Sequence, residues 1–244
     1  MLFPTARRLV LTVLFASTAI GSARAERILE YQGEARVAAD RTPGSVAYLE
    51  KHRVTLEDDG RFVRAETRYE SPEGRLLAEL RSDFSDSLTV PSHVFVDHRT
   101  GHSYGLRRED GRIVLFDQKQ GKPERVRVLT AEDAGDRLLV GCQGLNYYLV
   151  GRLDELKPSS RVPVRFLIPG KLDYYDFGLT ARDASPDGTV AFDVTIQNWF
   201  LRLFAPKLEV KYDKASQRLV GYRGISNLLN DRGENQAVTI TYTY

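Results

Sequence analysis

The chain has 244 residues, of which 42% are hydrophobic and 28% are charged, and its formal net charge is +2 at pH 7. Basic and acidic side chains are interleaved, as in RREDGR at 107–112. The basic face that a nucleic-acid-binding protein concentrates on one side is therefore not predicted. A single cysteine excludes an internal disulfide, so packing of the core must supply the stability.

The first 25 residues have the three parts of a secretory signal peptide. Arg7 and Arg8 precede an apolar run from Leu9 to Ile20, and Ala23-Arg24-Ala25 supplies the small residues of a cleavage site. The run is shorter than the roughly 20 residues that a membrane-spanning helix needs. We therefore expect cleavage after residue 25, one β-rich domain over 26–244, and a periplasmic or secreted location without a transmembrane segment in the mature chain.

Residues 26–244 alternate between apolar and polar side chains with the period of a β-strand. Val63, Ala65, Thr67 and Tyr69 share one face of the clearest example, and similar alternation occurs at 162–168, 190–196, 208–212 and 238–242. Turn signals such as EDDG, SPEG and SPDG separate the segments. The pattern predicts roughly ten to twelve antiparallel strands. A sheet this long should curve into a barrel or half-barrel.

Three of the four histidines lie close together in SHVFVDHRTGH, as His93, His98 and His102, with Asp97 among them. Imidazole and carboxylate groups are common metal ligands. The spacing matches no metal motif, and a hairpin with histidines on its turn explains it equally well. The segment therefore leaves metal binding undecided, and no metal site is predicted.

One helix is expected in the stretch GCQGLNYYLVGRLDELK at 141–157. Leu145, Leu149, Leu153 and Leu156 recur near a helical period beside Tyr148, and Pro158 stops the pattern. We expect this helix to pack against the concave face of the sheet. Cys142 precedes it, where a helix N-terminus would favour a thiolate.

Neither a second cysteine nor a neighbouring histidine equips Cys142 for chemistry, and a free cysteine more often behaves as a small buried hydrophobe. A structural role is predicted for it.

Two aromatic segments are candidates for a ligand site. KLDYYDFGL at 171–179 alternates aromatic and acidic side chains, and QNWFLRLFAPKL at 197–208 is the most apolar part of the chain after the signal segment. Aromatic clusters fill cores more often than they bind ligands. If they instead line a cavity, the predicted ligand-binding residues are Tyr148, Tyr175, Trp199, Phe200 and Phe204.

Segments 91–117, 162–179 and 198–228 together resemble a family of secreted bacterial proteins of unassigned function. The order of strands, a Tyr-rich helix and further strands is also similar, in topology only, to periplasmic carriers of the LolA and LolB type. This second resemblance implies a non-enzymatic protein that binds a hydrophobic ligand. The first resemblance assigns no role to any residue.

Motifs for nucleophilic catalysis and for phosphate binding give no support for an enzyme. The one GxSxG match, GHSYG at 101–105, lies in the expected hairpin and not between a strand and a helix, and SxxK, GxGxxG and GxxxxGK[ST] do not occur. No cofactor and no catalytic residue are predicted. The preferred hypothesis is an exported non-enzymatic protein that binds a lipid, another hydrophobic ligand or a cell-envelope partner. The alternatives are an exported hydrolase with dispersed catalytic residues and a structural assembly factor without a cavity.

Overall fold

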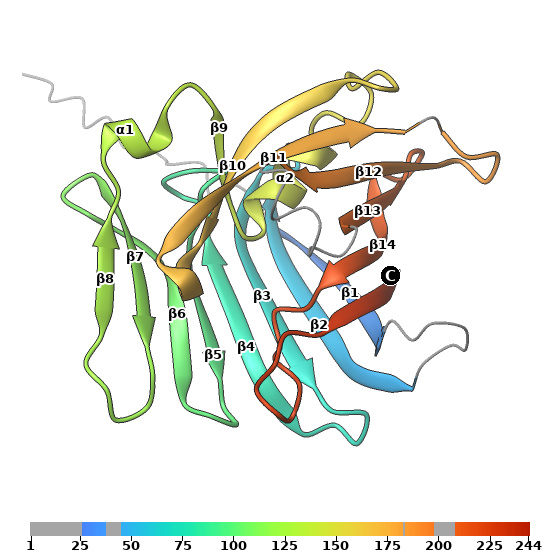
Figure 1. The fold of residues 1–244 in the computed structure, drawn as a ribbon. Coiled ribbons are helices and arrows are strands. Elements are labelled where there is room, and N and C mark those ends of the chain that lie inside the picture. Colours follow the sequence, from blue (N-terminus) through green and yellow to red (C-terminus); the bar gives the residue numbers. More distant parts are fainter. Residues whose placement is uncertain (1–25, 38–44, 183, 198–207) are drawn as a thin grey trace, which may run out of the picture.

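The computed structural model describes residues 26–37, 45–182, 184–197 and 208–244 (Figure 1). The predicted signal peptide, residues 1–25, lies outside these ranges. The described chain is mainly β, and its strands form one large curved sheet. The first strands are β1 (Glu26–Val37), β2 (Val46–Glu57), β3 (Phe62–Glu70), β4 (Leu76–Asp83), β5 (Ser92–Asp97), β6 (His102–Glu109), β7 (Arg112–Gln118) and β8 (Arg125–Val128). The others are β9 (Leu138–Gly141), β10 (Arg161–Ile168), β11 (Asp173–Ala181), β12 (Thr189–Ile196), β13 (Leu208–Asp213), β14 (Arg218–Ile225) and β15 (Ala237–Thr243).

The sheet consists of two runs of sequential neighbours. One run leads from β1 to β8 and the other from β9 to β15, and the pairing of β1 with β15 joins them. The two edges of the sheet are therefore β8 and β9, and in the described part of the chain no backbone pairing closes them. The expected curved, mainly antiparallel sheet is confirmed, and over the described residues it is open rather than closed into a barrel.

The alternation predicted from the sequence sets the faces of the strands. On β3, Ala65, Thr67 and Tyr69 are buried while Arg64 and Glu66 are exposed. The predicted number of strands is too low, because the described residues form fifteen. The four-residue strands β8 and β9 are too short to show alternation. In addition, β9 pairs parallel to β10, since the crossover through residues 142–160 lets the chain return in the same direction.

The predicted helix is shorter than expected. Helix α2 covers Gly144–Val150, and residues 151–155 continue as turns. Glycine at position 151 is a weak helix former and coincides with the end of the helix. Tyr148, Leu149 and Leu153 are nevertheless buried. Figure 1 shows α2 within the curve of the sheet, as expected.

Two short helical turns were not predicted. Helix α1 (Ala131–Ala134) begins with a capping box, in which Thr130 and Asp133 bond each other's backbone N–H groups. The 3₁₀ turn η1 covers Pro169–Lys171. Four or fewer residues are too few to give a helical period, although the Thr-x-x-Asp spacing at 130–133 is a capping signal.

The gap between β8 on one side and α1 with β9 on the other is here called the seam. Side chains bridge it where backbone hydrogen bonds do not. A buried apolar cluster contains Leu106, Leu115 and Leu129 from one side, with Leu139 and Leu167 from the other. Burial of this cluster holds the two edges together.

An ionic bridge reinforces the apolar cluster of the seam. The guanidinium of Arg127 on β8 lies 2.8 Å from Asp133 of α1 and 2.6 Å from Asp173 of β11. It also stands over the ring of Tyr174, 5.1 Å from the ring centroid. Two elements, α1 and β11, are thus tied to β8.

Candidate functional site

The structure describes two of the five predicted ligand-binding residues. Tyr148 is buried, and Tyr175 packs against the same apolar cluster, which also contains Leu149 of α2 and Phe177 of β11. The two tyrosines therefore belong to one core region, as the hypothesis of a shared aromatic lining requires. Trp199, Phe200 and Phe204 lie outside the described residues. The set as a whole stays a prediction.

The three clustered histidines point to separate partners. His93 is buried, and its Nδ1 lies 3.1 Å from the Pro91 carbonyl oxygen. His98 contacts Glu79 at 3.1 Å, and His102 contacts Asp117 at 2.6 Å. Over the described ranges, no group of three histidine, cysteine or acidic side chains converges so as to hold a metal ion.

Cys142 is partly buried and packs against the apolar cluster of Ala35, Tyr48 and Tyr69. Burial raises the pKa of its thiol to about 12, so the thiol stays protonated and unreactive near neutral pH. Its φ of 42° places it in the left-handed region. The next residues begin α2, whose Gly144 lies so near the Thr89 carbonyl that an added Cβ would overlap the carbonyl oxygen.

A chain of hydrogen bonds runs through the buried face of β2 and β3. The Nε2 of His52 lies 3.0 Å from Glu50 Oε2, and its Nδ1 lies 2.8 Å from Thr67 Oγ1. The amide of Gln143, just before α2, donates to the same threonine oxygen at 3.1 Å. One proton arrangement satisfies all three bonds. The Nε2–H of His52 donates to the Glu50 carboxylate, and the Thr67 hydroxyl donates to Nδ1 of His52 while its oxygen accepts from Gln143.

Tyrosines enclose the Glu50 carboxylate. Tyr242 donates its hydroxyl to Glu50 Oε2 at 3.2 Å, and Tyr31 stacks on His52 with 4.3 Å between the ring centroids. Burial, together with the negative charge of Glu50, raises the pKa of Tyr242 and Tyr69 well above the ordinary value. These phenols stay protonated and serve as donors.

Gly33 makes the approach of Tyr242 possible. It lies opposite Glu50 on one neighbouring strand and opposite Tyr242 on the other. A Cβ at this position would stand 2.7 Å from Cε1 of Tyr242 and 2.9 Å from Cγ2 of Ile240. The absent side chain leaves the space through which the tyrosine ring leans toward the carboxylate.

The order of groups from Thr67 through His52 to Glu50 is hydroxyl, imidazole, carboxylate, the order of a nucleophile, its base and an orienting acid. Solvent and substrate have no access to these groups, because Thr67 is only 1% exposed and Glu50 only 5%. A substrate carbonyl cannot reach the hydroxyl in this arrangement. The chain of bonds links Gln143, just before α2, to β2 and β3, but the Oε1 of Gln143 is buried without a hydrogen-bond partner in the described structure, so the network is only partly satisfied.

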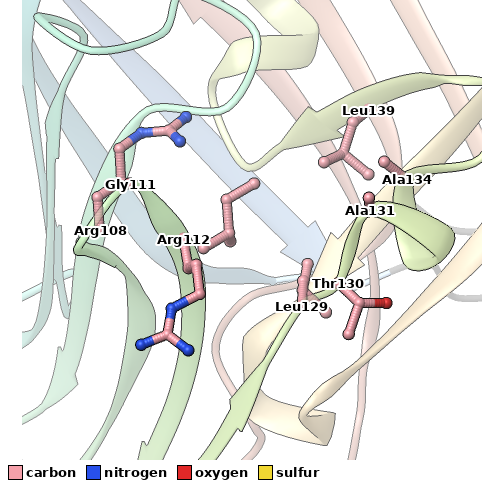
Figure 2. Close-up of a pocket in the computed structure, with 9 residues that line it drawn as sticks. Arg108, Gly111, Arg112, Leu129, Thr130, Ala131, Ala134 and Leu139 are labelled. Atoms are coloured by element: carbon pink, nitrogen blue, oxygen red, sulfur yellow. The ribbon is translucent and has the colours of Figure 1, made fainter.

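A cavity of about 290 Å³ opens at the seam (Figure 2). Its apolar wall comes from both sides of the seam: Ile113 of β7 and Leu129 after β8 on one, Ala131 and Ala134 of α1 with Leu139 of β9 on the other. Three of these side chains, Ile113, Leu129 and Leu139, also belong to the apolar cluster of the seam. The cavity is thus an unfilled part of the junction between the two edges.

Two arginines complete the cavity lining. Figure 2 shows the side chains of Arg108 and Arg112 on one side and those of Leu129, Ala134 and Leu139 on the other. Arg108 donates from Nη2 to the Val90 carbonyl at 3.3 Å, whereas its buried Nε has no hydrogen-bond partner among the described residues. Arg112 is largely exposed and stands 3.8 Å from Asp110.

Sequence reasoning missed both the cavity and the buried carboxylate. The position of Glu50 carries a signal, because it shares a strand face with His52, Val54 and Leu56. Unlike Glu50, the residues of the cavity give no local signal. They are scattered from 108 to 139 and meet only because β8 and β9 form the two edges of one sheet.

No protein-family model matches the chain, and no curated protein matches it. Among solved structures, the chain is similar to one described as a beta-barrel-like protein of domain of unknown function DUF1849 from Brucella abortus. The two are 10% identical, with a TM-score of 0.41, and the alignment covers 90% of this chain and 100% of the other.

A likeness this distant carries no information about function. The similarity to LolA and LolB carriers stays a prediction. No helix in the described ranges has the length and apolar composition to span a membrane.

Proposed function

We propose that this chain is an exported, non-enzymatic protein that binds a hydrophobic ligand at the seam of its open sheet. The observation that carries the proposal is the cavity of about 290 Å³, whose walls are largely apolar. Ligand cavities in proteins have volumes of about 300–1,000 Å³, apolar walls and a few placed polar groups. The seam cavity lies just below that range in volume and has the same division between apolar and polar groups.

The position of the cavity also supports a carrier role. Its walls come from two sheet edges that side chains hold together, so the ligand would enter where the sheet has no backbone pairing to break. A filled interior would favour a structural assembly factor instead. The cavity therefore favours binding over that alternative.

Extraction of lipid from the purified protein, followed by mass spectrometry, tests the proposal. We expect a co-purifying amphiphile in the wild-type protein and less of it in Ala134→Trp, in which the indole would fill the cavity from α1. Thr239→Trp is the matched control, because it adds an indole at an exposed strand position away from the seam. Equal ligand content in all three proteins, or none in any, would contradict the proposal.

A second candidate function, hydrolysis, has one specific observation in its favour. Thr67, His52 and Glu50 have the order of a catalytic relay, with distances of 2.8 and 3.0 Å. Because Thr67 is buried, we rank hydrolysis below ligand binding. Ester hydrolysis that is lost in Thr67→Val, with unchanged folding, would reverse the order.

Export is part of the same proposal and has its own test. The mature protein recovered from the periplasm or medium of an expressing bacterium is expected to begin at Glu26, as intact mass would show. A full-length mass would contradict cleavage of residues 1–25.

A further inference from the structure

The seam cavity combines apolar walls with positive charge that nothing in the lining balances. Of the nine described residues that line it, two are arginines and none is acidic. The hydroxyl of Thr130 is already committed, because it accepts from the Asp133 N–H and donates to the Asp133 carboxylate. The guanidinium groups of Arg108 and Arg112 are therefore the charged groups that can meet a ligand.

These guanidinium groups retain unused donors. Arg108 Nε is buried and lacks a hydrogen-bond partner in the described structure, and its nearest carboxylate oxygen, on Asp86, is 3.9 Å away. Arg112 is 3.8 Å from Asp110, beyond hydrogen-bond distance. A buried donor without a partner costs free energy that an incoming acceptor recovers.

From this arrangement we infer that the ligand is a single-chain amphiphile with an anionic head group, a carboxylate or a phosphate. The inference rests on the proposed function and names the class of ligand. The acyl chain lies against Leu129, Ala134 and Leu139, and the head group accepts hydrogen bonds from Arg108 and Arg112. Arginine suits this role because its planar fork of N–H donors matches both anions.

The volume limits the ligand to one chain. About 290 Å³ lies just below the usual range of cavities for drug-sized ligands. Two acyl chains and a glycerol backbone exceed this volume. Free fatty acids and alkyl phosphates share the required chemistry, and the experiment separates them by head group.

Titration calorimetry on the mature protein, residues 26–244, tests the inference. The probes are dodecanoate, dodecyl phosphate, methyl dodecanoate and dodecylammonium. Their chains have similar length and their head groups differ in charge. We expect the two anions to bind at least tenfold more tightly than the ester, and the cation to bind more weakly still. The stronger of the two anions identifies the head group.

Two charge-removing variants locate the head group. Arg108→Met and Arg112→Met keep an apolar stem of similar length, and each should weaken binding of the preferred anion about tenfold, as loss of a charge-assisted hydrogen bond predicts. Arg112 is largely exposed, so its variant should fold even if the Arg108 variant does not. Arg232→Met is the control, because the side chain of Arg232 is 82% exposed and does not line the seam cavity.

The outcomes separate this inference from the proposed function. Equal binding of the anions and the ester, unaffected by either arginine variant, would overturn the inference but leave an apolar site at the seam. Binding of none of the probes would overturn both. Anion-selective binding that Arg112→Met weakens and Arg232→Met does not would support the inference.

Discussion

Arg127 and Asp173 connect parts of the sheet that no backbone hydrogen bond joins. The guanidinium Nη1 on β8 lies 2.6 Å from Asp173 Oδ1 at the start of β11, and the same nitrogen donates to the Leu172 carbonyl at 3.2 Å. Because the contact crosses the seam, the geometry of the cavity depends on side-chain bonds. Such bonds can open locally without unfolding the strands on either side.

Replacement of Arg127 should therefore loosen the seam. Arg127→Gln is expected to lower the free energy of unfolding by about 1 kcal/mol, since the ion pairs are partly exposed and screened by solvent. Hydrogen exchange should accelerate in β8, α1 and β9 and not in β1–β4. Arg53→Gln, which removes an exposed pair with Glu30, is the control. Unchanged exchange at the seam would contradict the bridging role.

Gly33→Ala should destabilise the protein by about 1–3 kcal/mol, because the added methyl group overlaps Tyr242 and Ile240. Urea unfolding measures the loss. Gly221→Ala is the matched control on β14, where the nearest atom to an added Cβ is 3.5 Å away. Equal stability of the two variants would show that the space at Gly33 is not needed.

His93 predicts a specific dependence of stability on pH. Burial lowers the pKa of its imidazole from 6.5 to about 4. Above pH 6.5 the group is neutral in both states. Between about 6.5 and 4 the unfolded chain binds a proton that the folded protein does not, so the free energy of unfolding falls as the pH falls, by on the order of 3 kcal/mol.

Comparison of two variants isolates this contribution. His93→Gln should flatten the pH dependence of the unfolding free energy between pH 6.5 and 4, although the substitution itself costs some stability at neutral pH. His98→Gln removes an exposed histidine and should leave the slope in place. Identical slopes in the wild type and both variants would exclude His93 as the cause.

Cys142 should react slowly with thiol reagents in the folded protein. The raised pKa of its thiol keeps the reactive thiolate scarce at pH 8. Since it is the single cysteine, labelling in urea gives the internal reference for complete reaction. Cys142→Ser should cost about 1–3 kcal/mol of stability, because a hydroxyl is buried among apolar groups. Rapid labelling of the native protein would contradict a structural role.

Local signals in the sequence account for the class of fold and for much of the core. Alternation places Ala65, Thr67 and Tyr69 on one face of β3, and the helical period places Leu149 and Leu153 in the interior. The same signals fail for β8 and β9, which are too short for any period. The parallel pairing of β9 also depends on a crossover that alternation does not reveal.

The candidate site was harder to predict because it is built from distant positions. Tyr148 and Tyr175 pack in one apolar cluster, but their role in ligand binding stays a prediction. Arg108 and Leu139 lie on the two sides of the seam cavity, and nothing in their immediate sequence relates them. Their proximity follows from the order of strands in the whole sheet.

That order also affects how the protein folds. β1 lies beside β15, its partner on the order of 200 residues later, and this strand pair alone links the two runs of strands in the described sheet. Until β15 is in place, one edge of β1 is an open template for another chain. Charged side chains at Glu30, Glu34 and Arg36 on β1 would discourage such pairing. A chain cut before β15 should nevertheless aggregate more readily than the intact protein, because the edge of β1 that β15 covers stays open.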